Sequence, residues 1–123
     1  MTEPDGDTID PQAQARLQEW GGPKLLTQMV RLFLENAPVR LEQVRKGLAE
    51  GSLKDAERGV HSLKSSAANV GAVQLSKLAA HMENLAAGGD SAGVAQSLPG
   101  LEAAWAAAQT RLAATLAAAE GAE

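Results

Sequence analysis

The sequence predicts an all-α fold, an antiparallel up-down four-helix bundle with a short additional N-terminal helix. Hydrophobic residues make up 45% of the chain but aromatic residues only 2%, so the apolar side chains are mostly those of the strong helix formers Ala and Leu. Apolar residues recur at steps of three and four, which is typical of helices that bury one face. The interruptions of this pattern are short and contain Gly or Pro, which favours antiparallel neighbouring helices.

The first two helices are expected over residues 11–20 and 23–50. Asp10 followed by Pro11 is typical of an N-cap and a first helical turn, and two adjacent glycines separate the helices. Pro38 predicts a kink in the second helix, because the apolar pattern resumes after it. The polar residues 1–8 are expected to form a flexible arm, which leaves residues 9–120 as one domain.

Three further helices are expected: one that begins at Ser52 and is closed by Gly71, one that carries Leu75, Leu78, Met82 and Leu85 and ends at Gly88-Gly89, and one that runs to about Ala119. Ser52 and Asp55 resemble a capping box at the first of them. Asp90 or Ser91 can cap the last helix, and Pro99 predicts a kink within it. The apolar seam of the helix that begins at Ser52 is formed by Leu53, Ala56, Val60, Leu63, Ala67 and Val70.

Composition excludes several classes of function. Lys and Arg total 11 against 15 for Asp and Glu, a net charge of −4 with no basic tail, so nucleic acid is not an expected partner. The absence of Cys excludes disulfides and thiol chemistry. No apolar run is long enough to span a membrane, and the acidic start is unlike a signal peptide. We therefore expect a cytoplasmic protein with no membrane partner.

Only two histidines are present, and His61 is the better candidate for a reactive group. It lies off the apolar seam of its helix and is expected to face solvent, with Lys64 and Ser65 at i+3 and i+4, where their side chains can reach the imidazole. A neutral exposed imidazole is a nucleophile, and a nearby lysine can neutralise an incoming phosphoryl group. Such pairs are also common on solvated helix faces. His81 is expected to be a surface or partly packed histidine.

The segment from His61 to Ala72 reads His-Ser-Leu-Lys-Ser-Ser-Ala-Ala-Asn-Val-Gly-Ala. It closely resembles the signature of histidine-containing phosphotransfer (HPt) domains, in which a His-x-Leu-Lys-Gly-Ser run on a bundle helix precedes a Gly-Ala pair ten residues after the histidine. The similarity extends to Ile9-Asp10-Pro11, Leu32-Phe33-Leu34, Leu75, Leu78, Met82-Glu83 and Gly89-Asp90. The resemblance therefore covers nearly the whole chain in order.

The resemblance implies that His61 is phosphorylated at Nε2 and that Lys64 supports the phosphoryl oxygens. Family members often place Gln or Glu twenty-two positions after the histidine, hydrogen-bonded to the other ring nitrogen. Here that position is Glu83, which could instead be a solvated helix carboxylate. The protein would be a phosphocarrier without kinase activity, with no cofactor of its own and with Mg²⁺ in the partner receiver domain. The implied partners are response-regulator receiver domains and a hybrid histidine kinase, and the protein is expected to be a monomer.

Ser65 departs from the family pattern, which usually has Gly directly after the Lys. Its hydroxyl could donate to a phosphoryl oxygen, or its side chain could crowd the docking surface. Gly59 could likewise keep that surface flat or allow a close helix crossing. The residues expected to contact the partner are Glu57, Arg58, His61, Lys64, Ser65 and Ala68.

Other chemistries find little support in the sequence. Neither histidine has Glu three residues before it, and His-Glu-x-x-His is absent, so no metal site is expected. Ser62 follows His61 where the phosphoacceptor helix of a sensor kinase has an acidic residue, and no nucleotide-binding motif is present. We expect a phosphorelay intermediate that accepts a phosphoryl group from an aspartyl phosphate and passes it to another receiver. The alternatives are a non-phosphorylated adaptor or inhibitor that binds a receiver or kinase, and a purely structural helical module.

Overall fold

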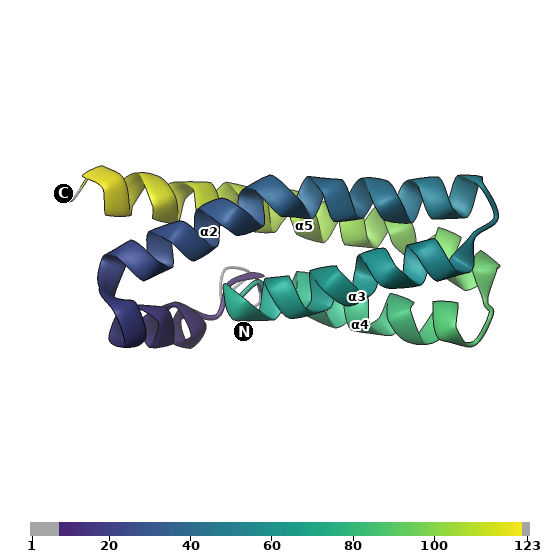
Figure 1. Cartoon of the computed structure of the whole chain (residues 1–123), viewed down its shortest axis with the longest axis horizontal. Helices are drawn as coiled ribbons and strands as arrows, with labels where there is room; N and C mark the ends of the chain where they lie inside the picture. Colours follow the sequence, from purple (N-terminus) through teal and green to yellow (C-terminus); the bar gives the residue numbers. More distant parts are fainter. Residues whose placement is uncertain (1–7, 122–123) are drawn as a thin grey trace, which may run out of the picture.

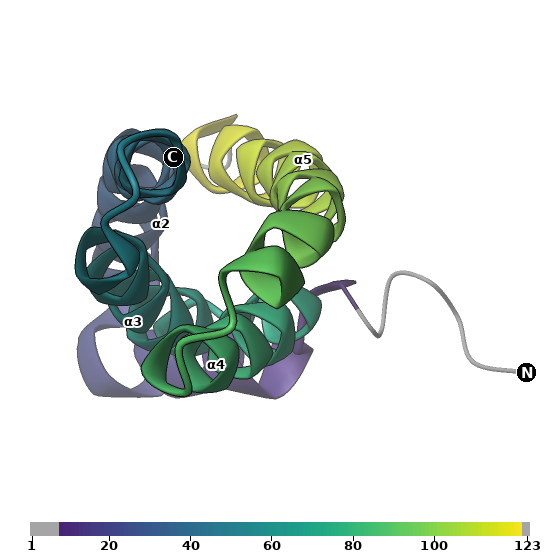
Figure 2. The ribbon, with the colours of Figure 1, turned by 90° about the vertical axis from the view of Figure 1, so that its right-hand side faces the viewer.

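The computed structural model describes residues 8–121, and this part of the chain folds into four helices without a strand. The helices are α2 (Pro11–Ala49), α3 (Leu53–Asn69), α4 (Val73–Ala87) and α5 (Ser91–Gly121). They alternate in direction along the bundle (Figure 1) and form a closed ring when viewed along it, with α2 between α3 and α5 (Figure 2). The predicted all-α up-down bundle is confirmed. Residues 1–7, most of the predicted arm, lie outside the described residues.

Helix α2 contains the predicted short N-terminal helix as its first segment. Asp10 caps it by accepting a hydrogen bond from the backbone N–H of Gln12 at 3.0 Å. Gly22 has φ 72° and ψ −172°, a conformation outside the helical region that favours glycine, and the chain changes direction there. The short segment lies at the end of the bundle where α3 ends and α4 begins (Figure 1). It is attached there by a 2.6 Å hydrogen bond from the N–H of Asp10 to the carbonyl of Gly71.

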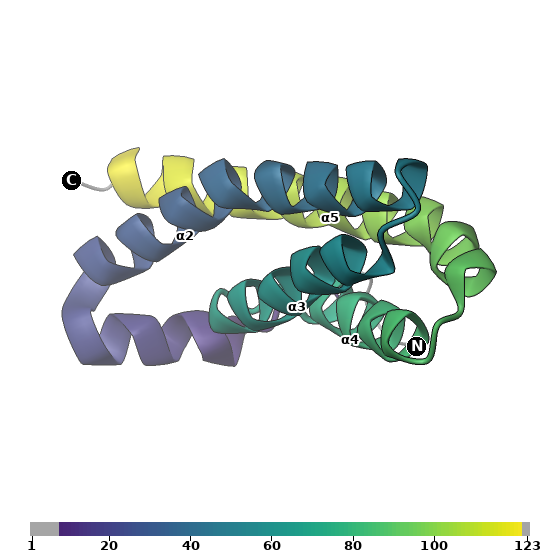
Figure 3. The ribbon, with the colours of Figure 1, turned by 45° about the vertical axis from the view of Figure 1, so that its right-hand side comes forward.

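In the other helices, the predicted capping side chains form hydrogen bonds to backbone N–H groups, and the predicted prolines lie within helices. The Ser52 hydroxyl accepts from the N–H of Asp55 at 3.3 Å, and Asp90 accepts from the N–H of Gly93 at 2.8 Å. Helix α2 continues through Pro38. The first turns of α5 run at an angle to the rest of the helix (Figure 3), in agreement with the kink expected near Pro99.

Helices α2 and α3 cross closely at Gly59, which is buried. A Cβ atom at this position would lie 2.7 Å from Cγ2 of Val44 and 2.9 Å from the carbonyl oxygen of Arg40. Of the two interpretations of Gly59, the structure therefore supports the close helix crossing. This crossing brings the outer side chains of α2 beside the exposed face of α3.

The core is filled by the predicted apolar seams. Leu63 of α3, Leu75 and Met82 of α4 and Leu101 of α5 are at most 1% exposed. Aromatic contact links α2 to α5, where Phe33 and Trp105 pack edge to face with ring centroids 5.6 Å apart. No helix in residues 8–121 is long and apolar enough to cross a lipid bilayer.

Candidate functional site

His61 lies in the middle of α3 and projects into solvent. Its neighbours Val60 and Leu63 are 1% and 0% exposed because they belong to the buried seam, and the helical period turns the next side chain outward. The His61 side chain is 61% exposed. The expectation that it faces solvent is confirmed.

Glu83 reaches His61 from the neighbouring antiparallel helix α4. Its Oε2 lies 2.5 Å from Nδ1 of the imidazole, and its side chain is only 19% exposed. Glu83 is therefore not a freely solvated carboxylate. A carboxylate accepts from the N–H of Nδ1 and so favours the tautomer in which Nε2 carries the lone pair. This arrangement leaves Nε2 as the nucleophilic atom of the ring.

The other oxygen of Glu83 is bound by Lys64. The ammonium donates to Oε1 at 2.6 Å, so one carboxylate joins Lys64 and His61, which lie one turn apart on α3. The pKa of Glu83 is lowered, chiefly by the hydrogen bond from Lys64 and further by that from His61, while partial burial opposes the shift. The carboxylate is thus ionised at neutral pH. Sequence reasoning missed the pairing of Lys64 with Glu83, because it depends on how α4 aligns with α3.

On the side facing α2, the surface beside His61 is hollowed and lined mostly by polar and charged side chains. Ser65 is exposed there. Two adjoining hollows contain His61. The first is lined by Asn36, Ala37, Arg40, His61, Ser62, Leu63, Ser65 and Ser66. The second is lined by Arg40, Gln43, Glu57, Arg58, His61, Ser62 and Glu83.

Arg40 borders both hollows and is the main site residue that sequence reasoning missed. It comes from α2, and no local pattern links it to His61, since their proximity depends on the helix crossing at Gly59. Arg58 adds a second exposed cation, whose one ion pair within residues 8–121 is a 3.7 Å contact with Asp55. The surface beside the imidazole therefore carries two arginines together with the carboxylates of Glu57 and Glu83.

The structure brings most of the predicted contact residues together. Glu57 and Arg58 share a hollow with His61, and Ser65 lines the other. Ala68 instead borders a separate hollow beside Trp20, at the short segment of α2.

The remaining candidates lie elsewhere or are not found. His81 is exposed on α4 and has no hydrogen-bond partner among residues 8–121. That same part of the chain contains no group of three or more His, Cys, Asp or Glu that could hold a metal ion.

Comparison with known families defines the class of this protein. The model of the Hpt domain family matches residues 28–120, so the chain belongs to the Hpt domain family. The match begins after the short N-terminal segment and includes His61, Lys64 and Glu83. No curated protein and no solved structure is significantly similar to the chain. Membership implies a role in histidine phosphotransfer within phosphorelays, in which Hpt domains act as phosphocarriers that interact with receiver domains and kinases.

Proposed function

We propose that this protein is a phosphorelay intermediate in which His61 accepts a phosphoryl group from the aspartyl phosphate of one receiver domain and passes it to a second receiver. The observation that carries the proposal is the exposed imidazole whose Nδ1 is bound by the ionised carboxylate of Glu83. This contact accounts for both the orientation of the ring and the availability of Nε2.

The phosphoryl group can be transferred without the loss of a proton from this chain. The lone pair of Nε2 attacks phosphorus, a P–N bond forms, and the P–O bond to the aspartate breaks with its electron pair leaving on the carboxylate. Nδ1 keeps its proton, so the ring of His61 becomes positively charged. Glu83 then faces an imidazolium and stabilises the charge that develops during the attack. Transfer to the second receiver is the reverse reaction on a new aspartate.

Cationic side chains are proposed to stabilise the phosphoryl group, which carries close to two negative charges. An ammonium has three N–H donors, and Glu83 occupies one of those on Lys64. Lys64 can therefore hold the carboxylate and a phosphoryl oxygen together. Arg40 and Ser65 both line the hollow beside His61.

We expect the partners to be response-regulator receivers and a hybrid histidine kinase, engaged by a cytoplasmic monomer. The chain is expected to need no cofactor of its own, the Mg²⁺ of the reaction belonging to the receiver. The direction of net transfer follows from which receiver is phosphorylated first.

The test is phosphotransfer from a phosphorylated receiver domain of the source organism to the purified chain. Wild type is expected to acquire phosphate that is labile in acid and stable in base, as a phosphoramidate is. His61→Gln should acquire none, and His81→Gln should match wild type. Phosphate that persists in His61→Gln would overturn the proposal.

An adaptor that binds a receiver without being phosphorylated is the second candidate, and Ser65 is the observation that favours it. Its side chain lines the hollow beside His61, where the family usually has no side chain. If Ser65 blocks the approach of the receiver's phosphoryl group, wild type should bind the receiver but stay unphosphorylated, and Ser65→Gly should become phosphorylated. Equal transfer to wild type and Ser65→Gly argues against the adaptor.

A further inference from the structure

Ser76, near the start of α4, forms a hydrogen bond to the backbone of α3. Its hydroxyl donates to the carbonyl oxygen of Lys64 at 2.9 Å, in a partly buried position. A carbonyl oxygen has two lone pairs, so it can accept this bond and still take part in the hydrogen bonds of its own helix. Other hydroxyls of the bundle bond within their own helices, as Thr110 does to Ala106 at 3.1 Å. The bond from Ser76 differs because it forms only when α4 lies at one height beside α3.

Ser76 shares a face of α4 with Glu83. The two residues are seven apart, which is close to two helical turns and about 10 Å along the axis. Ser76 binds the backbone of Lys64, and Glu83 binds its ammonium at 2.6 Å. The second oxygen of the Glu83 carboxylate lies 2.5 Å from Nδ1 of His61. A shift of α4 by the rise of one residue, about 1.5 Å, would therefore break the bond from Ser76 and move the carboxylate off the imidazole.

The apolar contacts between α3 and α4 come in good part from small side chains. Helix α4 buries Ala79 and Ala86, and α3 buries Ala56 and Ala67. Short side chains form shallow ridges, which restrict the sliding and rotation of packed helices less than large ones do. A directional polar contact within an apolar interface can specify an alignment that hydrophobic packing leaves open. The bond from Ser76 to α3 is such a contact.

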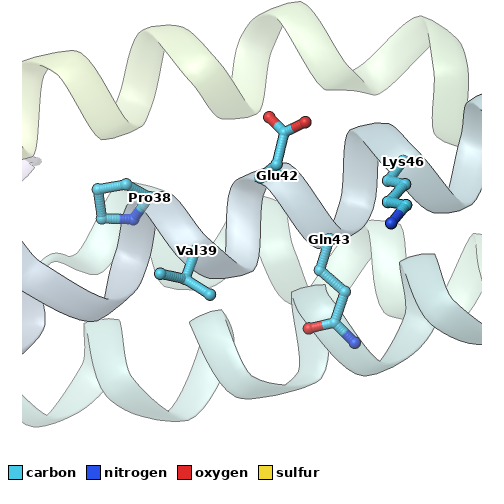
Figure 4. Close-up of a pocket in the computed structure, with 5 residues that line it drawn as sticks. All are labelled: Pro38, Val39, Glu42, Gln43 and Lys46. Carbon is cyan, nitrogen blue, oxygen red and sulfur yellow. The ribbon is translucent and has the colours of Figure 1, made fainter.

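Helix α2, which packs against α3 on the side away from α4 (Figure 2), is aligned by a different kind of contact. It meets α3 where the buried Gly59 leaves no room for a Cβ atom. Its polar side chains near this crossing bond within α2, Arg40 to Gln43 at 3.3 Å and Arg45 to Glu42 at 3.2 Å. Figure 4 shows Glu42 and Gln43 leaving α2 in opposite directions. Steric fit thus sets the position of α2, whereas α4 is joined to the site by hydrogen bonds.

We propose that Ser76 is a positioning residue for phosphotransfer. Its hydrogen bond to the backbone of Lys64 sets the alignment of α4 that places the carboxylate of Glu83 on both the ammonium of Lys64 and Nδ1 of His61. The effect on transfer rests on the proposed function, whereas the effect on the imidazole does not. Ser76 lines neither of the two hollows that contain His61, so it acts on the chemical step and not on the binding of a receiver.

The first test compares Ser76→Ala with wild type by nitrogen NMR of the imidazole of His61. Alanine removes the hydroxyl and favours a helix more than serine does, so α4 should stay folded. Wild type should show one tautomer, with the proton on Nδ1, and Ser76→Ala a mixture of both. Ser76→Thr keeps a hydroxyl and should restore the single tautomer. Thr110→Ala is the matched control, since it removes a hydroxyl that bonds within α5, and it should leave the tautomer unchanged.

Transfer kinetics provide the second test. Single-turnover transfer from a phosphorylated receiver should slow roughly threefold to tenfold in Ser76→Ala, the scale of one hydrogen bond, with KM unchanged. Phosphoramidate, a small donor that phosphorylates an imidazole with release of ammonia, should react more slowly by the same factor. The double variant of Ser76→Ala and Glu83→Ala should be no slower than Glu83→Ala alone, because Ser76 acts through Glu83. A residue that only stabilises the bundle would add a loss of its own.

The outcomes distinguish the two proposals. If no receiver phosphorylates wild type, the proposed function fails, and the tautomer of His61 still decides the role of Ser76. If Ser76→Ala keeps the single tautomer and the rates of wild type, packing alone positions Glu83 and the role of Ser76 is overturned. It is also overturned if Ser76→Thr does not restore the tautomer, because the hydroxyl would then not be the group that aligns α4.

Discussion

The two histidines of this chain provide a comparison between similar positions with different surroundings. Both are exposed on a helix and both lie next to a buried residue, Val60 before His61 and Met82 after His81. His61 has a carboxylate on its Nδ1. His81 has no hydrogen-bond partner within residues 8–121.

The difference arises from the helix opposite rather than from the histidine. Lys64 at i+3 from His61 is joined to it through Glu83 of α4, whereas the i+3 neighbour of His81 is Asn84. Exposure alone thus does not orient the imidazole as a nucleophile. An acceptor from a second helix is needed to fix the tautomer.

The largest effect is expected for the nucleophile. His61→Gln should abolish phosphorylation by a receiver, while His81→Gln should leave both rate and extent unchanged, because only the first removes the oriented Nε2. Phosphate incorporation after a single encounter with a phosphorylated receiver measures this. Equal losses in the two variants would show that the surroundings of His61 do not make it the phosphorylated residue.

Glu83 should come next. Glu83→Ala removes the acceptor on Nδ1 and is expected to slow transfer on the order of tenfold or more, whereas Glu83→Gln keeps an amide oxygen there and should slow it less. Nitrogen NMR of the imidazole supplies a readout of positioning, since the alanine variant should show mixed tautomers at His61. Asn84→Ala, beside His81, is the control and should change neither observable.

An unaltered tautomer in Glu83→Ala, together with slower transfer, would require a different explanation. Glu83 would then act on the developing charge of the ring rather than on its orientation. The rescue by glutamine distinguishes these cases, because a neutral amide can orient the ring but provides little stabilisation of an imidazolium.

Lys64 and Lys77 form a matched pair of smaller expected effect. Each lies within about one turn of a histidine on its own helix, Lys64 after His61 and Lys77 before His81. Lys64→Ala should reduce the transfer rate roughly threefold to tenfold, the scale of one charge-assisted hydrogen bond, and Lys77→Ala should have no effect. Single-turnover kinetics with a saturating receiver measure the chemical step separately from binding. A rate unchanged in Lys64→Ala would exclude its contact with the phosphoryl group.

The sequence predicted the fold well because the determinants of the helices are local. Asp10 with Pro11, the glycines before Pro23, and Ser52 act within a few residues of the helix ends that they define. The exposure of His61 followed from its offset from one apolar seam. These inferences need only the helical period.

The site was less predictable because its contacts join different helices. The link between His61 and Glu83 came from resemblance to a family, not from spacing, and the pairing of Lys64 with Glu83 was missed. Arg40 had no local signal at all, since it reaches His61 only through the crossing of α2 and α3 at Gly59. Contacts of this kind depend on the rotation and alignment of packed helices, which composition and periodicity leave open.

The smallest expected effect concerns stability in acid. The pKa of Glu83 is lowered in the folded chain, first by Lys64 and then by His61, from an ordinary value of 4.5. Its ionised form therefore stabilises the fold above about pH 4.5, and this contribution is lost as the pH falls through the lower pKa of the folded state. Glu83→Gln cannot titrate, so the free energy of unfolding of wild type should exceed that of the variant near neutral pH, and the difference should shrink in acid. Urea unfolding at about pH 7 and about pH 3 measures it. A difference that stays constant between these conditions would show that the carboxylate orients His61 without contributing to the acid stability of the bundle.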